Sequence, residues 1–479
     1  MMYLVFSSAI FLFVFFPAVF LLYRIFPGLK AKNILLAVSS VVFYAFGQLE
    51  YVPLFLGSVL INYLSGLALM RMKENRKLIL AVSVLLNIGI LCYYKYTNFA
   101  IDNINRAFGS AIEARDIILP IGISFFTFQG LSYTIDVYRD AGTGTTDPLK
   151  LLLYIAFFPQ LIAGPIVKYH DVSAQIDERS CSPELTAYGI KRFVVGLSKK
   201  ILIANTAGYI ADTVFGECLA SGIHDWPLMW LGGICYTLQI YYDFGGYSDM
   251  AIGMGRMFGF TFRENFDHPY GAASIKEFWR KWHISLSSWF KEYLYIPLGG
   301  NRRGRVRTVI NKLIVFFCTG IWHGANWTFV LWGMLHGMLS SLEDLNVIPA
   351  KKLCETKLGR LVSRLYTLLA VMLLFVIFKA DNVTQAFTVI SGMFTGGPSA
   401  EGAYMLRRLL SPAAVLVLAA AVLLAGNLPA RIAGRLKSAE GNSNTAIELA
   451  GMVGCVVLYA LCVMSLARGG FNPFIYFQF

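Results

Sequence analysis

Two histidines in apolar surroundings are the residues of this chain best suited to chemistry. The first, His323, lies near the middle of an apolar run, and between Lys312 and Glu343 only His323 and His336 carry ionisable side chains apart from the thiol of Cys318. Placing an ionisable group in hydrocarbon costs free energy, so such a residue is a functional candidate unless a neutral imidazole merely bonds neighbouring helices together. Because an imidazole titrates near neutral pH, we favour a functional role for His323.

The second histidine, His283, ends the segment 276–283, in which Trp, Lys and Arg are mixed. That mixture is typical of a segment lying at the membrane interface. The setting of His283 is less apolar than that of His323, so an interfacial role and a functional role are both open.

A basic, glycine-containing loop follows at 299–307. It either attracts the phosphates of a cofactor or marks the cytoplasmic face of the membrane, and the topological interpretation is favoured. The candidate phosphate ligands in this loop are Arg302, Arg303 and Arg305.

Two acids stand beside apolar residues in the segment 239–249, QIYYDFGGYSD. Asp243 and Asp249 are separated by Gly245 and Gly246, which we expect to break the helix. Buried acids usually pair with a base or face water. Each of these two therefore either orients a histidine or belongs to an ion pair that holds helices together.

Helical spacing places further residues around His323, which directly follows Trp322. If 311–338 is one helix, Asn326 lies three residues further on the same face as His323. His336 lies thirteen residues on, and therefore on a different face. The two histidines are then no metal pair, and His336 is expected to be structural. The eight cysteines contain no CxxC, so we expect no metal site.

The composition indicates an integral membrane protein. Of 479 residues, 57% are hydrophobic and 14% are charged, whereas a soluble chain carries about 25% charged residues. A crossing needs about 20 mostly apolar residues, and such runs recur along the chain. We expect an all-α, polytopic protein with no soluble domain. The expected spans are 3–26, 33–49, 52–70, 78–94, 311–338, 359–379, 411–429 and 446–466.

The centre of the chain, 118–300, has a different pattern. Its apolar pieces are shorter and are interrupted by Gly, Pro and charged residues. Broken segments at membrane depth are tolerated where they pack against protein or line a water-filled cavity. We therefore expect re-entrant segments and a pore or tunnel there.

The net charge of +13 is explained by topology rather than by nucleic-acid binding, and the lipid bilayer is the expected partner. Lys and Arg cluster in short loops, which the positive-inside rule places in the cytoplasm. Both termini are then expected outside the cytoplasm. The clusters occupy 30–32, 71–77, 302–307, 351–364 and 431–437.

The tail 471–479 is rich in aromatic residues, and Tyr476 carries its only hydroxyl. Aromatic residues suit an interfacial belt. A tail ending free in water would not ordinarily be so aromatic, so we expect it to dock into the protein or a partner.

Four segments of the chain are distinctive in combination: WRKWHISLSSWFKEYLYIPLGGNRRG, IWHGANWTFVLWGMLHG, YYDFGGYSDMAIG and LPIGISFFTFQGLSYTIDVYR. Together they resemble the membrane-bound O-acyltransferase (MBOAT) family, and most of all its bacterial alginate O-acetylation branch. The resemblance is strong over 1–340 and continues weakly to the end. One departure is Phe378-Lys379-Ala380, where the branch usually shows Phe-Arg-Ala, and the charge is kept.

The resemblance implies a fold, which is a ring of tilted helices around a thin central tunnel within one membrane domain over 1–479. Its parts would be N-terminal helices over 1–110, a catalytic core over 111–340 and C-terminal helices over 341–479. The protein would span the bacterial inner membrane several times.

The resemblance also implies an activity and its residues. The chain would pass an acyl group, in this branch acetyl, from a cytoplasmic thioester such as acetyl-CoA to the outside, with no bound cofactor. His323 would be the catalytic histidine and His283 the second functional position. Tyr476 would relay the acyl group to an extracytoplasmic SGNH-hydrolase-like acetyltransferase. That partner would O-acetylate a polysaccharide such as alginate, with peptidoglycan or cellulose as the alternatives. The remaining candidates for the donor site and tunnel are Asp243, Asp249, Trp322, Asn326, Arg302, Arg303 and Arg305.

Two other classes of protein fit the same residues. In a proton-coupled transporter or flippase, His323, Asp243 and Asp249 would form a proton relay, and transport would consume no acyl donor. In a non-catalytic scaffold, both His323 and His283 would tolerate substitution.

Overall fold

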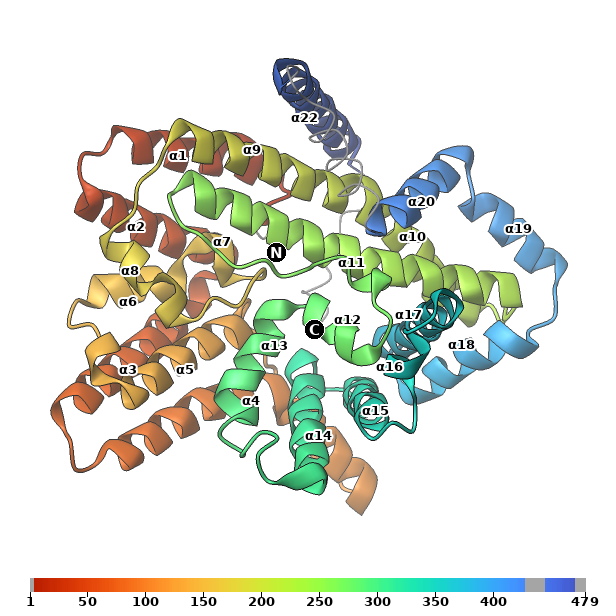
Figure 1. Cartoon of the computed structure of the whole chain (residues 1–479), viewed down its shortest axis with the longest axis horizontal. Helices are drawn as coiled ribbons and strands as arrows, with labels where there is room; N and C mark the ends of the chain where they lie inside the picture. The colour runs from red at the N-terminus through yellow and green to blue at the C-terminus, as the bar shows by residue number, and fades with distance from the viewer. Residues whose placement is uncertain (1–3, 427–443, 470–479) are drawn as a thin grey trace. The chain divides into compact units, whose positions relative to one another are not determined.

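The computed structural model describes residues 4–426 and 444–469, and within these ranges every regular element is a helix. This confirms the all-α class expected from the composition. Contacts divide the chain into two units, Met1–Phe193 with Tyr247–Glu264 and Val194–Gly246 with Asn265–Phe479. Figure 1 shows the course of the chain. A single membrane domain arranged as a ring around a tunnel stays a prediction.

The first unit contains the helices of the N-terminal part of the chain. They are η1 (Phe11–Phe15), α1 (Phe16–Ile25), α2 (Leu29–Gln48), η2 (Leu49–Tyr51), α3 (Val52–Arg71), α4 (Arg76–Phe108), α5 (Ile123–Arg139), η3 (Ala141–Thr143), α6 (Pro148–Ala156), α7 (Phe158–Leu161), α8 (Tyr169–Asp177) and most of α9 (Pro183–Ser198). A buried cluster of hydrogen-bonded polar side chains joins three of these helices. Asn62 of α3 and Asn87 of α4 exchange amide hydrogen bonds of 3.0 and 3.2 Å, and Thr134 of α5 donates to the amide oxygen of Asn62 at 2.9 Å. In apolar surroundings such bonds hold helices together.

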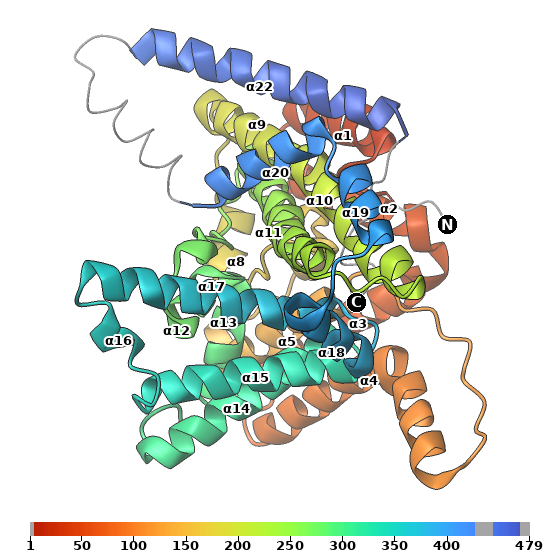
Figure 2. The same ribbon diagram turned by 90° about the vertical axis from the view of Figure 1, so that its right-hand side faces the viewer.

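The second unit carries both candidate histidines. Its elements are η4 (Lys199–Ala204), α10 (Asn205–Thr213), η5 (Val214–Cys218), most of α11 (Trp226–Met257), η6 (Pro269–Gly271), α12 (Ile275–Lys281), α13 (Ile284–Phe290), η7 (Lys291–Tyr295), α14 (Gly304–His323), α15 (Trp327–Asp344), α16 (Ala350–Leu353), α17 (Lys357–Lys379), α18 (Val383–Thr395), α19 (Ala400–Leu409), α20 (Pro412–Ala425) and α22 (Asn444–Ala467). An aromatic core that includes Tyr236, Trp332 and Phe375 is buried among them. Figure 2 shows α14, α15 and α17 of this unit side by side.

Among the described residues, four helices are long and apolar enough to cross a membrane. A bent pair, Ala400–Leu409 with Pro412–Ala425 at 73°, adds a fifth if it is counted as one span. The four are Leu29–Arg71, Arg76–Phe108, Lys357–Lys379 and Glu448–Ala467. Leu29–Arg71 combines α2, η2 and α3 and covers two expected spans, 33–49 and 52–70. The other three coincide with the expected spans at 78–94, 359–379 and 446–466.

The expected break at Gly245-Gly246 is wrong, because α11 is a continuous helix of 32 residues. Helix packing explains why a glycine is needed at position 246. A Cβ added there would stand 2.6 Å from the backbone oxygen of Gly196, closer than van der Waals contact allows. Gly246 therefore permits α11 to approach the backbone of α9.

The expected single span over 311–338 is also wrong, because α14 ends at His323 and α15 begins at Trp327. The two helices form a hairpin. At its open end, Lys312 near the middle of α14 forms an ion pair with Asp344, the last residue of α15. Three residues, 324–326, close the other end.

Candidate active site

His283 is held by a short buried network. It is 1% exposed, and its Nδ1 lies 3.2 Å from the side-chain oxygen of Asn265. The same oxygen accepts from the backbone N–H of Ser285 at 3.2 Å and from its hydroxyl at 2.8 Å. Because a backbone N–H can only donate, the atom of Asn265 that faces this cluster is the oxygen. His283 is therefore more deeply buried than His323, although its hydrogen-bonding partners are polar side chains.

The backbone at His283 takes a left-handed conformation. Its φ is 43°, and it directly precedes α13. On either side of it, Ile284 N–H donates to Asn265 O at 2.9 Å and Asp267 N–H donates to Lys281 O at 3.0 Å. A positive φ costs free energy for a residue with a side chain, and these two bonds hold the chain in that conformation.

His323 is the last residue of α14 and is surrounded by aromatic rings. It is 8% exposed, and its ring centroid lies 5.1 Å from those of Trp332 and Phe378. The C-terminal end of a helix carries partial negative charge, which stabilises a nearby cation. His323 therefore lies at the negative end of the α14 dipole.

Trp322 lies between the two histidines. Its ring centroid is 6.0 Å from that of His283 and 4.9 Å from that of His323. The fold thus brings together three of the residues that the sequence singled out, although 40 positions separate the histidines.

Asn326 does not share a helical face with His323, because the helix ends between them. Its side-chain oxygen accepts from Thr328 N–H at 3.1 Å and so caps the start of α15. Its amide nitrogen donates to the backbone oxygen of Asp381 at 2.7 Å. Both contacts fix the closed end of the hairpin beside His323.

The two acids of α11 each belong to an ion pair. Asp243, 1% exposed, lies 2.7 Å from Nζ of the buried Lys200 within the second unit. Asp249 belongs to the first unit, where Arg192 donates to it from Nε at 2.8 Å and also binds Glu264. Of the alternatives left open by the sequence, ion pairing is the one that the structure favours for both acids.

The arginines of the basic loop and Tyr476 are the remaining candidates. Arg302, Arg303 and Arg305 are exposed in the turn before and the first residues of α14. Tyr476 lies outside the described residues.

Lys379 stands at the position where the sequence departs from the family pattern. It forms an ion pair of 2.5 Å with Asp212, so its ammonium group is paired with a carboxylate of the same unit.

His336 contacts the same aromatic cluster as His323. Its ring lies 5.0 Å from that of Trp332, and its Nδ1 accepts a hydrogen bond of 3.2 Å from Trp279 Nε1. The expectation that His323 and His336 lie on different faces assumed one continuous helix over 311–338. In the hairpin, both contact Trp332, the aromatic residue that they share.

Sequence reasoning missed the residues that position the histidines. Asn265 lies 18 positions before His283 across a loop, and Phe378 lies on α17, so no periodicity links either to its histidine. Trp332 was also missed, since its position facing His323 requires the turn at 324–326. The signal for that turn was the Gly-Ala-Asn stretch itself, because Asn is a common helix N-cap.

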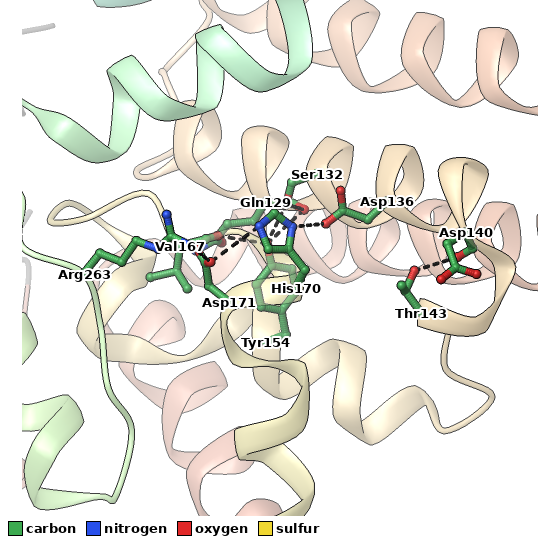
Figure 3. Close-up of polar contacts among 10 residues, drawn as sticks. All are labelled: Gln129, Ser132, Asp136, Asp140, Thr143, Tyr154, Val167, His170, Asp171 and Arg263. Atoms are coloured by element: carbon green, nitrogen blue, oxygen red, sulfur yellow. Dashed lines mark hydrogen bonds and ion pairs between the residues drawn. The ribbon is translucent and has the colours of Figure 1, made fainter. Parts of the chain in front are cut away.

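A second polar cluster, also missed, lies in the first unit (Figure 3). His170 of α8 lies 2.9 Å from the buried Asp136 of α5 through Nδ1 and 3.4 Å from Asp171 through Nε2. Arg263 binds Asp171 at 2.5 Å. These contacts tie the segment after α11 to α8 and α5, so the cluster holds the first unit together.

Comparison with known proteins gives a consistent family. Residues 137–347 match the family model described as MBOAT, membrane-bound O-acyltransferase family. The chain is 38% identical to a probable alginate O-acetylase of Azotobacter vinelandii, over 99% of this chain and 100% of that protein. It is 36% identical to a peptidoglycan O-acetyltransferase of Helicobacter pylori, over 81% of this chain and 80% of that protein.

A more distant similarity extends to a protein named for a different polymer. The chain is 29% identical to a teichoic acid D-alanyltransferase of Bacillus subtilis, over 47% of this chain and 58% of that protein. All of these names describe transfer of an acyl group, and the apolar helices described above are those of a multi-pass membrane protein. The chain therefore belongs to the membrane-bound O-acyltransferase family, in the branch of the alginate O-acetylases, and is an O-acyltransferase.

Proposed function

We propose that this enzyme moves an acetyl group from cytoplasmic acetyl-CoA across the bacterial inner membrane, for O-acetylation of an extracytoplasmic polysaccharide such as alginate. The names of the full-length relatives support the chemistry and the polymer. The observation that carries the proposal is the placement of His323 at the end of α14, beside Trp322 and the buried His283.

In this proposal His323 is the general base. It takes the proton of an acceptor hydroxyl while that oxygen attacks the thioester carbonyl carbon. The C–O bond forms, the C–S bond breaks, and the departing thiolate takes the proton from the imidazolium. A tyrosine hydroxyl has a pKa of about 10, so a positioned base matters, and such a base contributes typically about 10²–10⁴-fold.

The donor enters near His283 and the arginine-bearing loop in this proposal. Arg302, Arg303 and Arg305 are exposed, and guanidinium groups bind phosphate oxygens through paired hydrogen bonds. They would hold the phosphate end of the donor while the thioester reaches the histidines. Acetyl-CoA is a substrate here, so the enzyme needs no resident cofactor.

The acetyl group leaves on the outer side, carried by Tyr476 or passed directly to the nucleophile of a partner. The partner is an extracytoplasmic SGNH-hydrolase-like acetyltransferase, which selects the polysaccharide. Peptidoglycan and cellulose are the alternative acceptors. Supplying the enzyme to hosts that export only one of these polymers would identify the acceptor.

The transporter interpretation is disfavoured by the ion pairs of α11. A proton relay needs acids that can release and regain a proton during each cycle. Asp243 is paired with Lys200 and Asp249 with Arg192, so each acid would have to break an ion pair to join a relay. Consumption of acetyl-CoA by purified enzyme in proteoliposomes would separate the two classes.

The first prediction concerns His323. Replacing His323 with Ala removes the base, so acetylation of the exported polymer should fall by about 10²–10⁴-fold. The measurement is the acetyl content of the polymer in a host that lacks its own O-acetylase. His224→Ala, at a histidine of the second unit outside the cluster, is the matched control. Normal acetylation by His323→Ala, at equal protein level, would show that the assignment is wrong.

The second prediction concerns the relay. Tyr476→Phe removes the only hydroxyl of the tail, so no acetyl ester can form there and export of acetyl groups should stop. The measurement is polymer acetylation, together with mass spectrometry of the tail peptide for a bound acetyl group. Tyr459→Phe in α22 is the control. Full activity of Tyr476→Phe would leave direct transfer to the partner as the route.

A further inference from the structure

A cavity of about 370 Å³ opens in the second unit beside the α14–α15 hairpin. This volume lies within the range of small-molecule sites, about 300–1,000 Å³. One side is the face of α14 that carries Thr308, Lys312, Val315, Phe316 and Thr319. These positions extend over about 16 Å of helix, at a rise of about 1.5 Å per residue. The cavity is therefore elongated along the helix.

The lining is charged at one end and apolar at the other. Lys276 and Lys312 line the cavity at the open end of the hairpin, where both pair with Asp344. The exposed Lys291 adds a third ammonium group, so the charged end is positive overall. Further along α14 the wall is apolar. Its apolar members are Trp279, Leu286, Phe290, Val315 and Phe316.

The cavity is separate from the catalytic histidines. Neither His283 nor His323 is among its lining residues. Its apolar wall includes Trp279, whose indole donates to the buried His336, and His336 in turn contacts Trp332. A thioester bound in the cavity would have these side chains between its carbonyl and His323. We therefore expect the cavity to bind a molecule other than the reacting acyl thioester.

We propose that this cavity binds an anionic phospholipid of the surrounding membrane. The phosphate would lie among Lys276, Lys291 and Lys312, because an ammonium group binds phosphate as a point charge. One acyl chain would extend along α14 between Phe290 and Phe316. Basic and aromatic residues are the side chains that membrane proteins place at the level of lipid headgroups.

The test is photolabelling of the intact, purified enzyme with phosphatidylglycerol that carries a diazirine on its acyl chain. Label should appear in peptides from 284–295 and 304–323, and labelling by matched phosphatidylcholine should be several-fold weaker. Each of Lys276→Ala and Lys291→Ala should weaken labelling about fivefold, the factor given by roughly 1 kcal/mol per basic residue near an anionic surface. Val315→Phe should block the apolar end.

Matched controls lie on the same helices. Lys281→Ala removes another ion-paired lysine of α12, and Ile314→Phe enlarges the neighbour of Val315, yet neither residue lines the cavity. Both should label like the unaltered enzyme. Equal labelling by phosphatidylcholine, or labelling that survives Val315→Phe and both lysine variants, would overturn the proposal. Protection by acetyl-CoA would assign the cavity to the donor instead. Because no arm measures acetyl transfer, the result is independent of the proposed function.

Discussion

Asn265 determines which ring nitrogen of neutral His283 carries the proton. Its side-chain oxygen faces Nδ1 at 3.2 Å, and an amide oxygen can only accept. The proton of neutral His283 therefore lies on Nδ1, and Nε2 keeps its lone pair. A tautomer fixed by the partner of the other ring nitrogen is a common device in histidine chemistry.

The prediction at this scale is a loss of activity when Asn265 is replaced with Leu. The loss of one orienting hydrogen bond, worth about 0.5–1.5 kcal/mol, should lower kcat up to about tenfold and leave KM for acetyl-CoA nearly unchanged. Asn265→Asp keeps an acceptor oxygen and should recover part of the rate. Steady-state kinetics on the purified enzyme would measure both. An unchanged kcat for Asn265→Leu would mean that Asn265 does not position His283.

At the scale of elements, the hairpin of α14 and α15 depends on glycines where the helices cross. A Cβ on Gly333 would stand 2.4 Å from the backbone oxygen of Phe316, and a Cβ on Gly320 would stand 2.4 Å from that of Phe329. Backbone atoms cannot move aside as a flexible side chain can. The small residues therefore allow a close approach of two helices, as is common in membrane proteins.

We accordingly predict that Gly333→Ala separates the helices and destabilises the enzyme by about 1–3 kcal/mol, as overpacking does in other cores. The measurement is the midpoint of thermal unfolding in detergent. Gly89→Ala, in α4 with nothing within 4 Å of the added methyl, is the control and should be neutral or stabilising by up to about 1 kcal/mol. Equal midpoints for the two variants would contradict the close crossing.

The hairpin also shows what the sequence could and could not predict. Apolar run length located the long apolar helices α2, α3, α4, α17 and α22, because the cost of burying charge in lipid is visible in composition. It could not separate α14 from α15, since the turn at 324–326 contains no charge to interrupt the run. The candidates His283, His323 and Trp322 were found from residue type and family resemblance. Their partners Asn265 and Phe378 come from other elements, and only the fold brings them near.

At the scale of the whole molecule, the hairpin changes the expected course of the chain through the membrane. A single span over 311–338 would put the basic clusters at 302–307 and 351–364 on opposite sides. In the hairpin, the Lys312–Asp344 pair keeps the two ends together, so we expect both clusters on one side. This agrees with the positive-inside rule, which the single span violated.

The prediction is that cysteines introduced at Arg303 and Lys351 react alike with a membrane-impermeant maleimide. Both should label only after the inner membrane is opened, if the clusters are cytoplasmic. A cysteine at Asn382, beyond α17, should show the opposite behaviour. The background needs the eight native cysteines replaced and its activity retained. Different labelling at Arg303 and Lys351 would exclude the hairpin in the membrane.

The length of α14 has a consequence for transport. From Gly304 to His323 the helix rises about 28 Å, close to the thickness of a hydrocarbon core of about 30 Å. If α14 lies across the bilayer with its arginine-bearing end in the cytoplasm, as the proposed function requires, an acetyl group handed over at His323 has already passed most of the bilayer. Translocation and chemistry would then be a single event, and the enzyme would need no alternation between inward-open and outward-open states.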